Sequence, residues 1–223
     1  MTPRQCAWGA VFGTVASVGA LTYAEVALPA QTLLSDYALV PGGLVPVVIG
    51  MLALAAACLC LAYGLSLIEP SRSAATRVLL LAGAAGLMMS AIFPTDPASS
   101  DVDSLAGEIH RWAAALFFTS LPVAGWTLAR GRARSPRWNA VKAMSVTSAV
   151  TLAVYLAAHP ASFTSPWIAG DAYYGLLERG VVLAEMVLIT VMALATYQTR
   201  PTTRTAATPA ESAEPDLPEQ LAA

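Results

Sequence analysis

The sequence predicts an all-α integral membrane protein whose body is a bundle of six transmembrane helices with both termini in the cytoplasm. Hydrophobic residues make up 57% of the 223 residues and charged residues only 12%. A soluble domain usually carries about a quarter charged residues. Six stretches are apolar enough to cross a bilayer, and the basic residues are sorted to one side of them. The net charge of −2 gives no sign of a nucleic-acid partner.

A helix needs about 20 mostly apolar residues to cross the hydrocarbon core of a bilayer. Backbone polar groups in lipid must be satisfied within their own segment, so such stretches are helices. We expect them at residues 6–23, 44–68, 76–93, 109–128, 140–158 and 174–197.

Several boundaries of these stretches have a local cause. The third stretch stops at Pro94 and the fifth before Pro160, because proline ends a helix. Asp103 or Ser104 can cap the fourth, where Glu108 favours the helix dipole. The first stretch could instead be a cleaved signal peptide. Its apolar run is longer than the usual core of about 7–15 residues, which favours an uncleaved helix.

The basic residues fix the expected orientation. Ten of them fall on the side of the termini: Arg4, Arg72, Arg77, Arg130, Arg132, Arg134, Arg137, Lys142, Arg200 and Arg204. Arg111 and Arg179 fall on the other side. The positive-inside rule then places both termini in the cytoplasm. We expect the chain to be a multi-pass protein of the cell membrane.

The chain divides into a six-helix domain over residues 1–198 and a tail over residues 199–223. The tail is rich in Pro, Thr, Ala and Glu and has too few large apolar residues to form a core, so we expect it to be disordered. Small residues recur every four positions at Gly9, Gly13 and Ser17 and again at Ala82, Gly86 and Ser90. Such stripes favour close helix packing within one chain or between two copies, so the oligomeric state stays open.

Acidic side chains gather on the side away from the termini, where the connections are longer. They are Glu25, Asp36, Asp96, Asp101, Asp103, Glu108, Asp171 and Glu178. Binding and catalytic residues often lie on such connections. The catalytic candidates are Asp36, Asp96, His110, Glu178 and Glu185, and the ligand-binding candidates are Tyr37, Arg111 and Arg179. Unpaired charges near hydrocarbon are costly, so we expect the outer candidates to converge on one outward-facing polar site.

Glu185 is set apart because it falls near the middle of the sixth stretch. A carboxylate inside a membrane span usually faces the bundle interior, where it is paired or protonated. Glu178 lies seven residues earlier, on nearly the same helix face and about 10.5 Å away along the axis. We therefore expect Glu185 beneath the outer site, either as a hydrogen-bonded structural group or as a proton-handling or ligand-binding group.

No cofactor or metal is expected. His110 and His159 are the two histidines of the chain and fall at the outer ends of neighbouring stretches, a pattern too sparse for haem or a metal centre. Cys6, Cys58 and Cys60 show no metal-ligand spacing, and Cys58 and Cys60 point to different sides of a helix, so all three are expected as free thiols. The acidic loops leave divalent-cation binding open.

The arrangement resembles a bacterial family of six-helix membrane proteins, the domain of unknown function 998. Three short motifs carry the resemblance: Leu34-Ser35-Asp36-Tyr37, Phe93-Pro94-Thr95-Asp96 and His110 at the start of the fourth stretch. Their spacing covers most of the chain before the tail. The resemblance implies the six-helix fold and marks Asp36, Asp96 and His110, but it implies no substrate, because the activity of the family is unassigned.

Three functions fit these features. The first is a membrane protein that binds a lipid or a small apolar ligand in an outward-facing polar pocket. The second is a membrane-embedded enzyme, either an acid-catalysed prenyl or terpene cyclase or a lipid hydrolase, that uses the outer carboxylates and His110. The third is a proton-coupled transporter built around Glu185, which is less favoured because no internal repeat or broken helix is evident.

Overall fold

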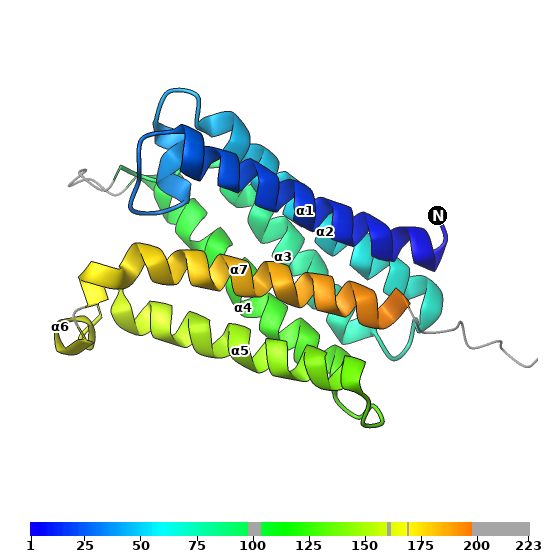
Figure 1. Cartoon of the computed structure of the whole chain (residues 1–223). Helices are drawn as coiled ribbons and strands as arrows, with labels where there is room; N and C mark the ends of the chain where they lie inside the picture. Colours follow the sequence, from blue (N-terminus) through cyan, green and yellow to red (C-terminus); the bar gives the residue numbers. More distant parts are fainter. Residues whose placement is uncertain (98–103, 160–161, 169, 198–223) are drawn as a thin grey trace, which may run out of the picture.

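The computed structural model describes residues 1–97, 104–159, 162–168 and 170–197, and over these residues it is helical and contains no strand. Six helices are long and apolar enough to cross a membrane, and they lie side by side in one bundle (Figure 1). They are α1 (Pro3–Ala27), α2 (Leu44–Ile68), α3 (Ala74–Ile92), α4 (Leu105–Ala129), α5 (Pro136–Ala158) and α7 (Gly170–Tyr197). Two short helices, η1 (Ser35–Leu39) and α6 (Ser165–Ile168), lie in the connections. The predicted six-helix fold is confirmed, whereas the predicted disordered tail lies outside the described residues.

Most helices begin a few residues before the apolar stretch that predicted them. At α1, Thr2 and Gln5 form a reciprocal capping box around Pro3. At α4, the Ser104 hydroxyl accepts a hydrogen bond of 3.0 Å from the Gly107 amide. Such caps satisfy the amides of a first turn, so a helix can continue from the apolar segment into polar sequence.

The six long helices form a closed ring in the order α1, α2, α3, α4, α5, α7, and α7 packs back against α1. Helix α7 also contacts α2 and α4 across the bundle, so it is the most buried of the six spans. The α1–α7 seam that closes the ring is its least extensive contact between neighbours, whereas α1 packs most extensively against α2. The residues that line this seam therefore decide how tightly the ring closes.

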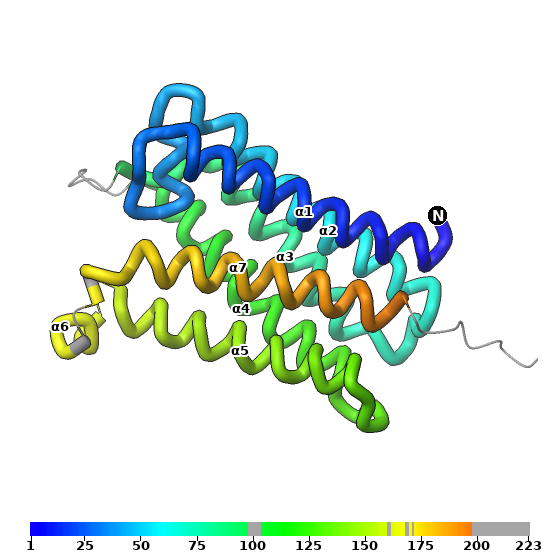
Figure 2. Tube along the Cα trace, in the orientation of Figure 1, coloured from blue at the N-terminus to red at the C-terminus, as the bar shows by residue number. Residues whose placement is uncertain are grey.

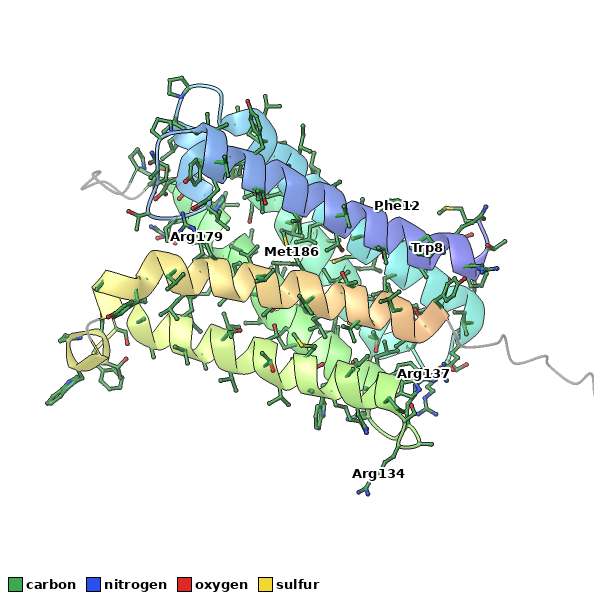
Figure 3. All side chains as sticks on the ribbon, in the orientation of Figure 1. Trp8, Phe12, Arg134, Arg137, Arg179 and Met186 are labelled. Carbon is green, nitrogen blue, oxygen red and sulfur yellow. The ribbon has the colours of Figure 1, made fainter. Side chains whose placement is uncertain are left out.

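Both described ends of the chain lie at the same end of the bundle, as the trace in Figure 2 shows. The Trp8 and Tyr197 rings meet there at 6.0 Å between centroids. Arg134 and Arg137 project from this end, whereas Arg179 lies at the opposite end (Figure 3), which we call the distal end. The placement of the distal end outside the cell stays a prediction.

Close helix contacts occur along both predicted small-residue stripes. A Cβ atom added at Gly13 would lie 2.7 Å from the Ala53 carbonyl oxygen of α2. One added at Gly86 would lie 2.5 Å from the Ala113 carbonyl oxygen of α4. Both stripes therefore pack against helices of the same chain. This is one of the two kinds of packing expected from the sequence, the other being packing between two copies.

Gly86→Ala is expected to lower the free energy of unfolding by about 1–3 kcal/mol, because the added methyl group pushes α3 away from the α4 backbone. Gly19→Ala is the matched control, since a Cβ there meets no atom within 4 Å. Thermal unfolding of both variants in the same detergent measures the difference. Equal melting temperatures would show that α3 and α4 are not in close contact at Gly86.

Candidate functional site

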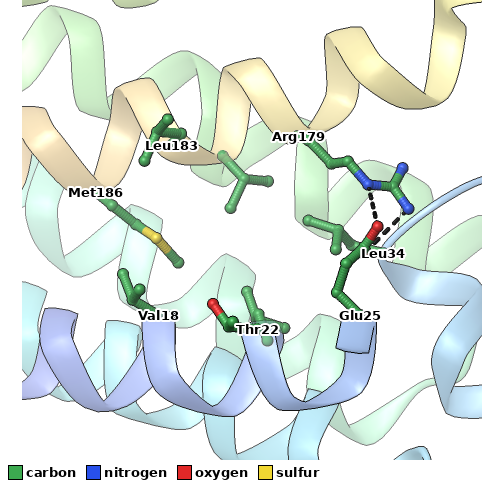
Figure 4. A pocket seen from close by; sticks show the side chains of 9 residues that line it. Val18, Thr22, Glu25, Leu34, Arg179, Leu183 and Met186 are labelled. Carbon is green, nitrogen blue, oxygen red and sulfur yellow. Dashed lines mark hydrogen bonds and ion pairs between the residues drawn. The ribbon is translucent and has the colours of Figure 1, made fainter. Parts of the chain in front are cut away.

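The Arg179 guanidinium ties the first distal connection to α7. It donates to both carboxylate oxygens of Glu25, at 2.9 and 3.1 Å, and the two charged side chains join α7 to the end of α1 (Figure 4). It also donates to the carbonyl oxygens of Gln31 at 3.0 Å, Thr32 at 2.8 Å and Gly175 at 2.9 Å. A guanidinium has five N–H donors, and these five bonds use them all. Arg179 therefore acts as a clamp within the protein.

The chain after this clamp folds back onto α7 through its amides. The Leu34 amide donates to the Glu178 carboxylate at 2.6 Å, and the Leu33 amide donates to Asp36 at 3.2 Å. The Tyr37 hydroxyl accepts from the Gln31 amide at 3.3 Å. Burial raises the pKa of Asp36, an effect opposed by the Leu33 amide and by the nearby His110 and Arg179. Asp36, Tyr37 and Glu178 thus share one buried polar region with Arg179.

Asp96 and Arg111 belong to a second polar region, at the start of α4. Asp96 accepts hydrogen bonds from the Ser104 amide at 3.0 Å and from its hydroxyl at 2.5 Å. These two bonds lower the pKa of Asp96, and Arg111 and His110 lower it further. Arg111 pairs with Glu108 at 2.7 Å, and nearly half of each side chain is exposed. Hydrogen bonds and an ion pair within the connection and the first turns of α4 therefore satisfy many of the polar groups in this second region.

His110 lies between the two regions. Its Nδ1 atom is 3.0 Å from the Ser90 carbonyl oxygen and 2.9 Å from that of Phe93, both at the end of α3. Because carbonyl oxygens only accept, Nδ1 carries a hydrogen. His110 is buried and close enough to Asp36 and Asp96 to act on the pKa of each. The predicted single site is thus arranged as two polar regions with His110 between them, and its role in binding or catalysis stays a prediction.

Polar side chains between α5 and α7 extend from the distal end into the bundle. The Tyr155 and Tyr174 hydroxyls are 2.7 Å apart, and the two rings stack with centroids 4.7 Å apart. Deeper, the Ser148 hydroxyl donates to Glu185 at 2.6 Å. The sequence interpretation did not single out Tyr155 or Ser148. Their seven-residue spacing, which matches that of Glu178 and Glu185 on the antiparallel partner, is the signal that could have found them.

An open groove of about 220 Å³ lies along the α1–α7 seam. Its walls are mostly apolar, and its distal end is formed by the Glu25–Arg179 pair (Figure 4). It is lined by Val18, Leu21, Thr22, Glu25, Leu34, Arg179, Val182, Leu183 and Met186. A second apolar groove, of about 410 Å³, lies between α3 and α4 and includes Ala85, Glu108 and Trp112. The first groove combines apolar walls with a partly exposed ion pair at one end.

The three cysteines are free thiols. Among the described residues, no group of three or more histidine, cysteine and acidic side chains is placed to hold a metal ion.

The fold and the site define a multi-pass α-helical membrane protein with a polar region at the distal end of its bundle. A family model described as a protein of unknown function, DUF998, matches residues 6–195, which cover nearly all of the six spans. The chain belongs to this family. No curated protein and no solved structure matches it.

Proposed function

We propose that the protein binds an amphiphilic membrane lipid in the groove between α1 and α7. The lipid chain lies against Val18, Leu183 and their neighbours, and the polar head lies beside Glu25. The strongest support is that apolar side chains and the charged Glu25–Arg179 pair line the same groove. Typical small-molecule pockets measure about 300–1,000 Å³. A groove of about 220 Å³ suits a segment of one hydrocarbon chain better than a bulky ligand.

The polar end of the groove selects the head of the lipid. Lipid tails are as apolar as leucine, so burying a chain in the groove gains little over the bilayer. Specific binding therefore depends on the head. The five donors of Arg179 are used within the protein, but each Glu25 oxygen accepts one hydrogen bond from Arg179 and has capacity for another. A head that donates hydrogen bonds, through a hydroxyl or an ammonium group, complements this carboxylate.

Catalysis on a lipid receives less support from the geometry. The Ser104 bonds that lower the pKa of Asp96 favour its ionised form, which is unsuited to protonate an olefin near neutral pH. The Nδ1 atom of His110 is engaged by two carbonyl oxygens, so only Nε2 could act on a substrate. Ligand binding requires no such proton donor.

Thr22→Trp is expected to reduce lipid binding in this groove about tenfold or more, which corresponds to about 1.4 kcal/mol. Thr22 is exposed and lines the groove, so an indole there occupies the space of the chain (Figure 4). The measurement uses the full-length protein in vesicles that contain a photoreactive phospholipid with a diazirine in its acyl chain. Mass spectrometry of the digested protein then gives the adducts on α1 and α7 peptides.

Two controls make this test specific. Val150→Trp adds an indole at an exposed position of α5 and is expected to leave the α1 and α7 adducts unchanged. Ala85→Trp fills the α3–α4 groove and should act on α3 and α4 adducts alone. If all three variants give equal α1 and α7 adducts, or if only Ala85→Trp reduces total labelling, the α1–α7 groove is not the lipid site.

A further inference from the structure

Glu185 is a carboxyl group enclosed at the centre of the membrane span of α7. Its side chain is fully buried, and it lies about 9 Å below the level of Arg179 along the helix axis. The Ser148 hydroxyl donates to Oε1, whereas Oε2 has no hydrogen-bond partner among the described residues. An ion removed from water without a counter-charge costs several kcal/mol. This position therefore favours a neutral carboxyl group with its proton on Oε2.

Few ionisable groups surround Glu185. From α2, the Cys58 thiol lies within electrostatic range. On α5, Tyr155 lies seven positions from Ser148 towards the distal end, and Lys142 lies six positions from it towards the termini. On α7 itself, Glu178 lies seven positions before Glu185, beside Asp36 of η1. Helices α1 and α4 carry their charged residues at their ends, and α6 carries none. In the described part of the chain, no cation forms an ion pair with Glu185, so the gain or loss of its proton is a change of net charge inside the bundle.

A line of polar side chains leads from the distal end to this carboxyl group. Asp36 and Glu178 lie at its entrance, and the bonded hydroxyls of Tyr155 and Tyr174 lie within electrostatic range of both. One turn further along α5, Thr151 lies between Tyr155 and Ser148, and its hydroxyl donates to the Ser148 carbonyl oxygen at 2.9 Å. Ser148 then contacts Glu185 directly. Hydroxyl and carboxyl groups can each donate and accept a hydrogen bond, which is the capacity that a proton path requires.

The other half of α7 offers no comparable line. Four interior residues follow Glu185 towards the termini, Leu188, Ile189, Met192 and Ala193, and all four are fully buried and apolar. The buried Thr196 comes only in the last turn of α7. Ser145 is the next buried polar residue of α5 in that direction, and its hydroxyl donates to the Val141 carbonyl oxygen of its own helix, as Thr151 does to that of Ser148. The difference between the two directions therefore lies in the apolar side chains of α7. An apolar, close-packed segment excludes the water and polar groups that a proton would need.

From these observations we propose that Glu185 is a proton-binding site that exchanges with the distal face of the membrane and not with the face that carries the termini. The polar stripe of α5 and α7, with Tyr155 as a positioning residue, connects the carboxyl group to that face. One-sided access distinguishes such a site from the centre of a proton-coupled transporter, which must open to both faces in turn. The site does not line the α1–α7 groove, so this proposal stands apart from lipid binding.

Labelling with dicyclohexylcarbodiimide tests the proposal on the wild-type chain. This apolar reagent enters membranes and reacts with protonated carboxyl groups, and mass spectrometry of α7 peptides separates adducts on Glu178 and Glu185. With the protein oriented in vesicles, raising the pH on the distal side is expected to lower labelling of Glu185. Once Glu185 is mostly ionised, its labelling should fall about tenfold for each further pH unit, as in any single-proton equilibrium. Raising the pH on the other side is expected to leave labelling unchanged.

Two variants complete the experiment. Glu185→Gln removes the adduct and keeps a similar shape, so its melting temperature reports whether the fold survives. Tyr155→Phe is expected to slow the response of Glu185 labelling to a distal pH jump while leaving the final extent unchanged, which a purely structural role would not do. Labelling that ignores pH, follows the pH on the side of the termini, or occurs on Glu178 without Glu185 would overturn the proposal.

Discussion

Arg132→Ala is expected to destabilise the fold strongly and to lower the free energy of unfolding by about 3–5 kcal/mol. The guanidinium of Arg132 pairs with both carboxylate oxygens of Glu69, and the two side chains are only 11% and 15% exposed. It also donates to the Leu128 carbonyl oxygen at 3.1 Å and lies 4.0 Å from the centre of the Trp138 ring. One side chain thus joins the α2–α3 connection to α4 and α5.

Most of this loss of stability is expected to come from Glu69, which remains in place after the Arg132 guanidinium is removed. Glu69 caps the C-terminus of α2, where the helix dipole already disfavours a negative charge. Without Arg132, that carboxylate stays mostly buried without its counter-charge, and the Trp138 ring loses a cation–π partner. The double variant Glu69→Gln with Arg132→Ala is therefore expected to be more stable than Arg132→Ala alone.

Arg134→Ala is the matched control, because Arg134 lies in the same connection but is exposed and projects away from the bundle (Figure 3). Its effect should stay within about 0.5 kcal/mol. Thermal or denaturant unfolding in one detergent compares the three variants with the wild type. The clamp is refuted if Arg132→Ala and Arg134→Ala melt alike, or if the double variant shows no recovery.

Arg179→Lys is expected to open the first distal connection while the bundle stays folded. Lysine keeps the charge but has three donors on one nitrogen, so it cannot reproduce the fork to Glu25 together with three carbonyl bonds. The Gln31, Leu33 and Leu34 amides should then exchange with solvent at least about tenfold faster, a loss of about 1.4 kcal/mol of local stability.

Hydrogen exchange followed by mass spectrometry measures these amides directly. In the wild type these amides donate to Tyr37, Asp36 and Glu178, so we expect them to exchange slowly. Arg111→Lys serves as the comparison, since Arg111 pairs with the half-exposed Glu108 on α4, and pairs of this kind contribute about 0–1 kcal/mol. Unchanged exchange in Arg179→Lys, or equal acceleration in both variants, would show that Arg179 does not hold this connection.

The sequence by itself determined the number, the nature and the approximate bounds of the membrane spans. A span is a local property, because about 20 apolar residues must cross the hydrocarbon whatever surrounds them. The bounds of α2 were predicted to the residue, and Ser104 was expected as one of two caps of α4. The Glu108–Arg111 pair is equally local, since residues three apart lie on one helix face.

Only the tertiary structure decided which distant groups meet. Arg179 pairs with Glu25, 154 positions away, and Glu185 meets Ser148, because helix order and rotation bring these faces together. Glu25 was expected among the outer acids, but neither Glu25 nor Ser148 was among the predicted site residues. Hydropathy reports the depth of a side chain in the membrane but not its angular position on the helix. That angle is set by packing, here by the close contacts of Gly13 in α1 with α2 and of Gly86 in α3 with α4. The same packing leaves the α1–α7 seam as the least extensive contact in the ring, and so creates the groove that no local pattern could reveal.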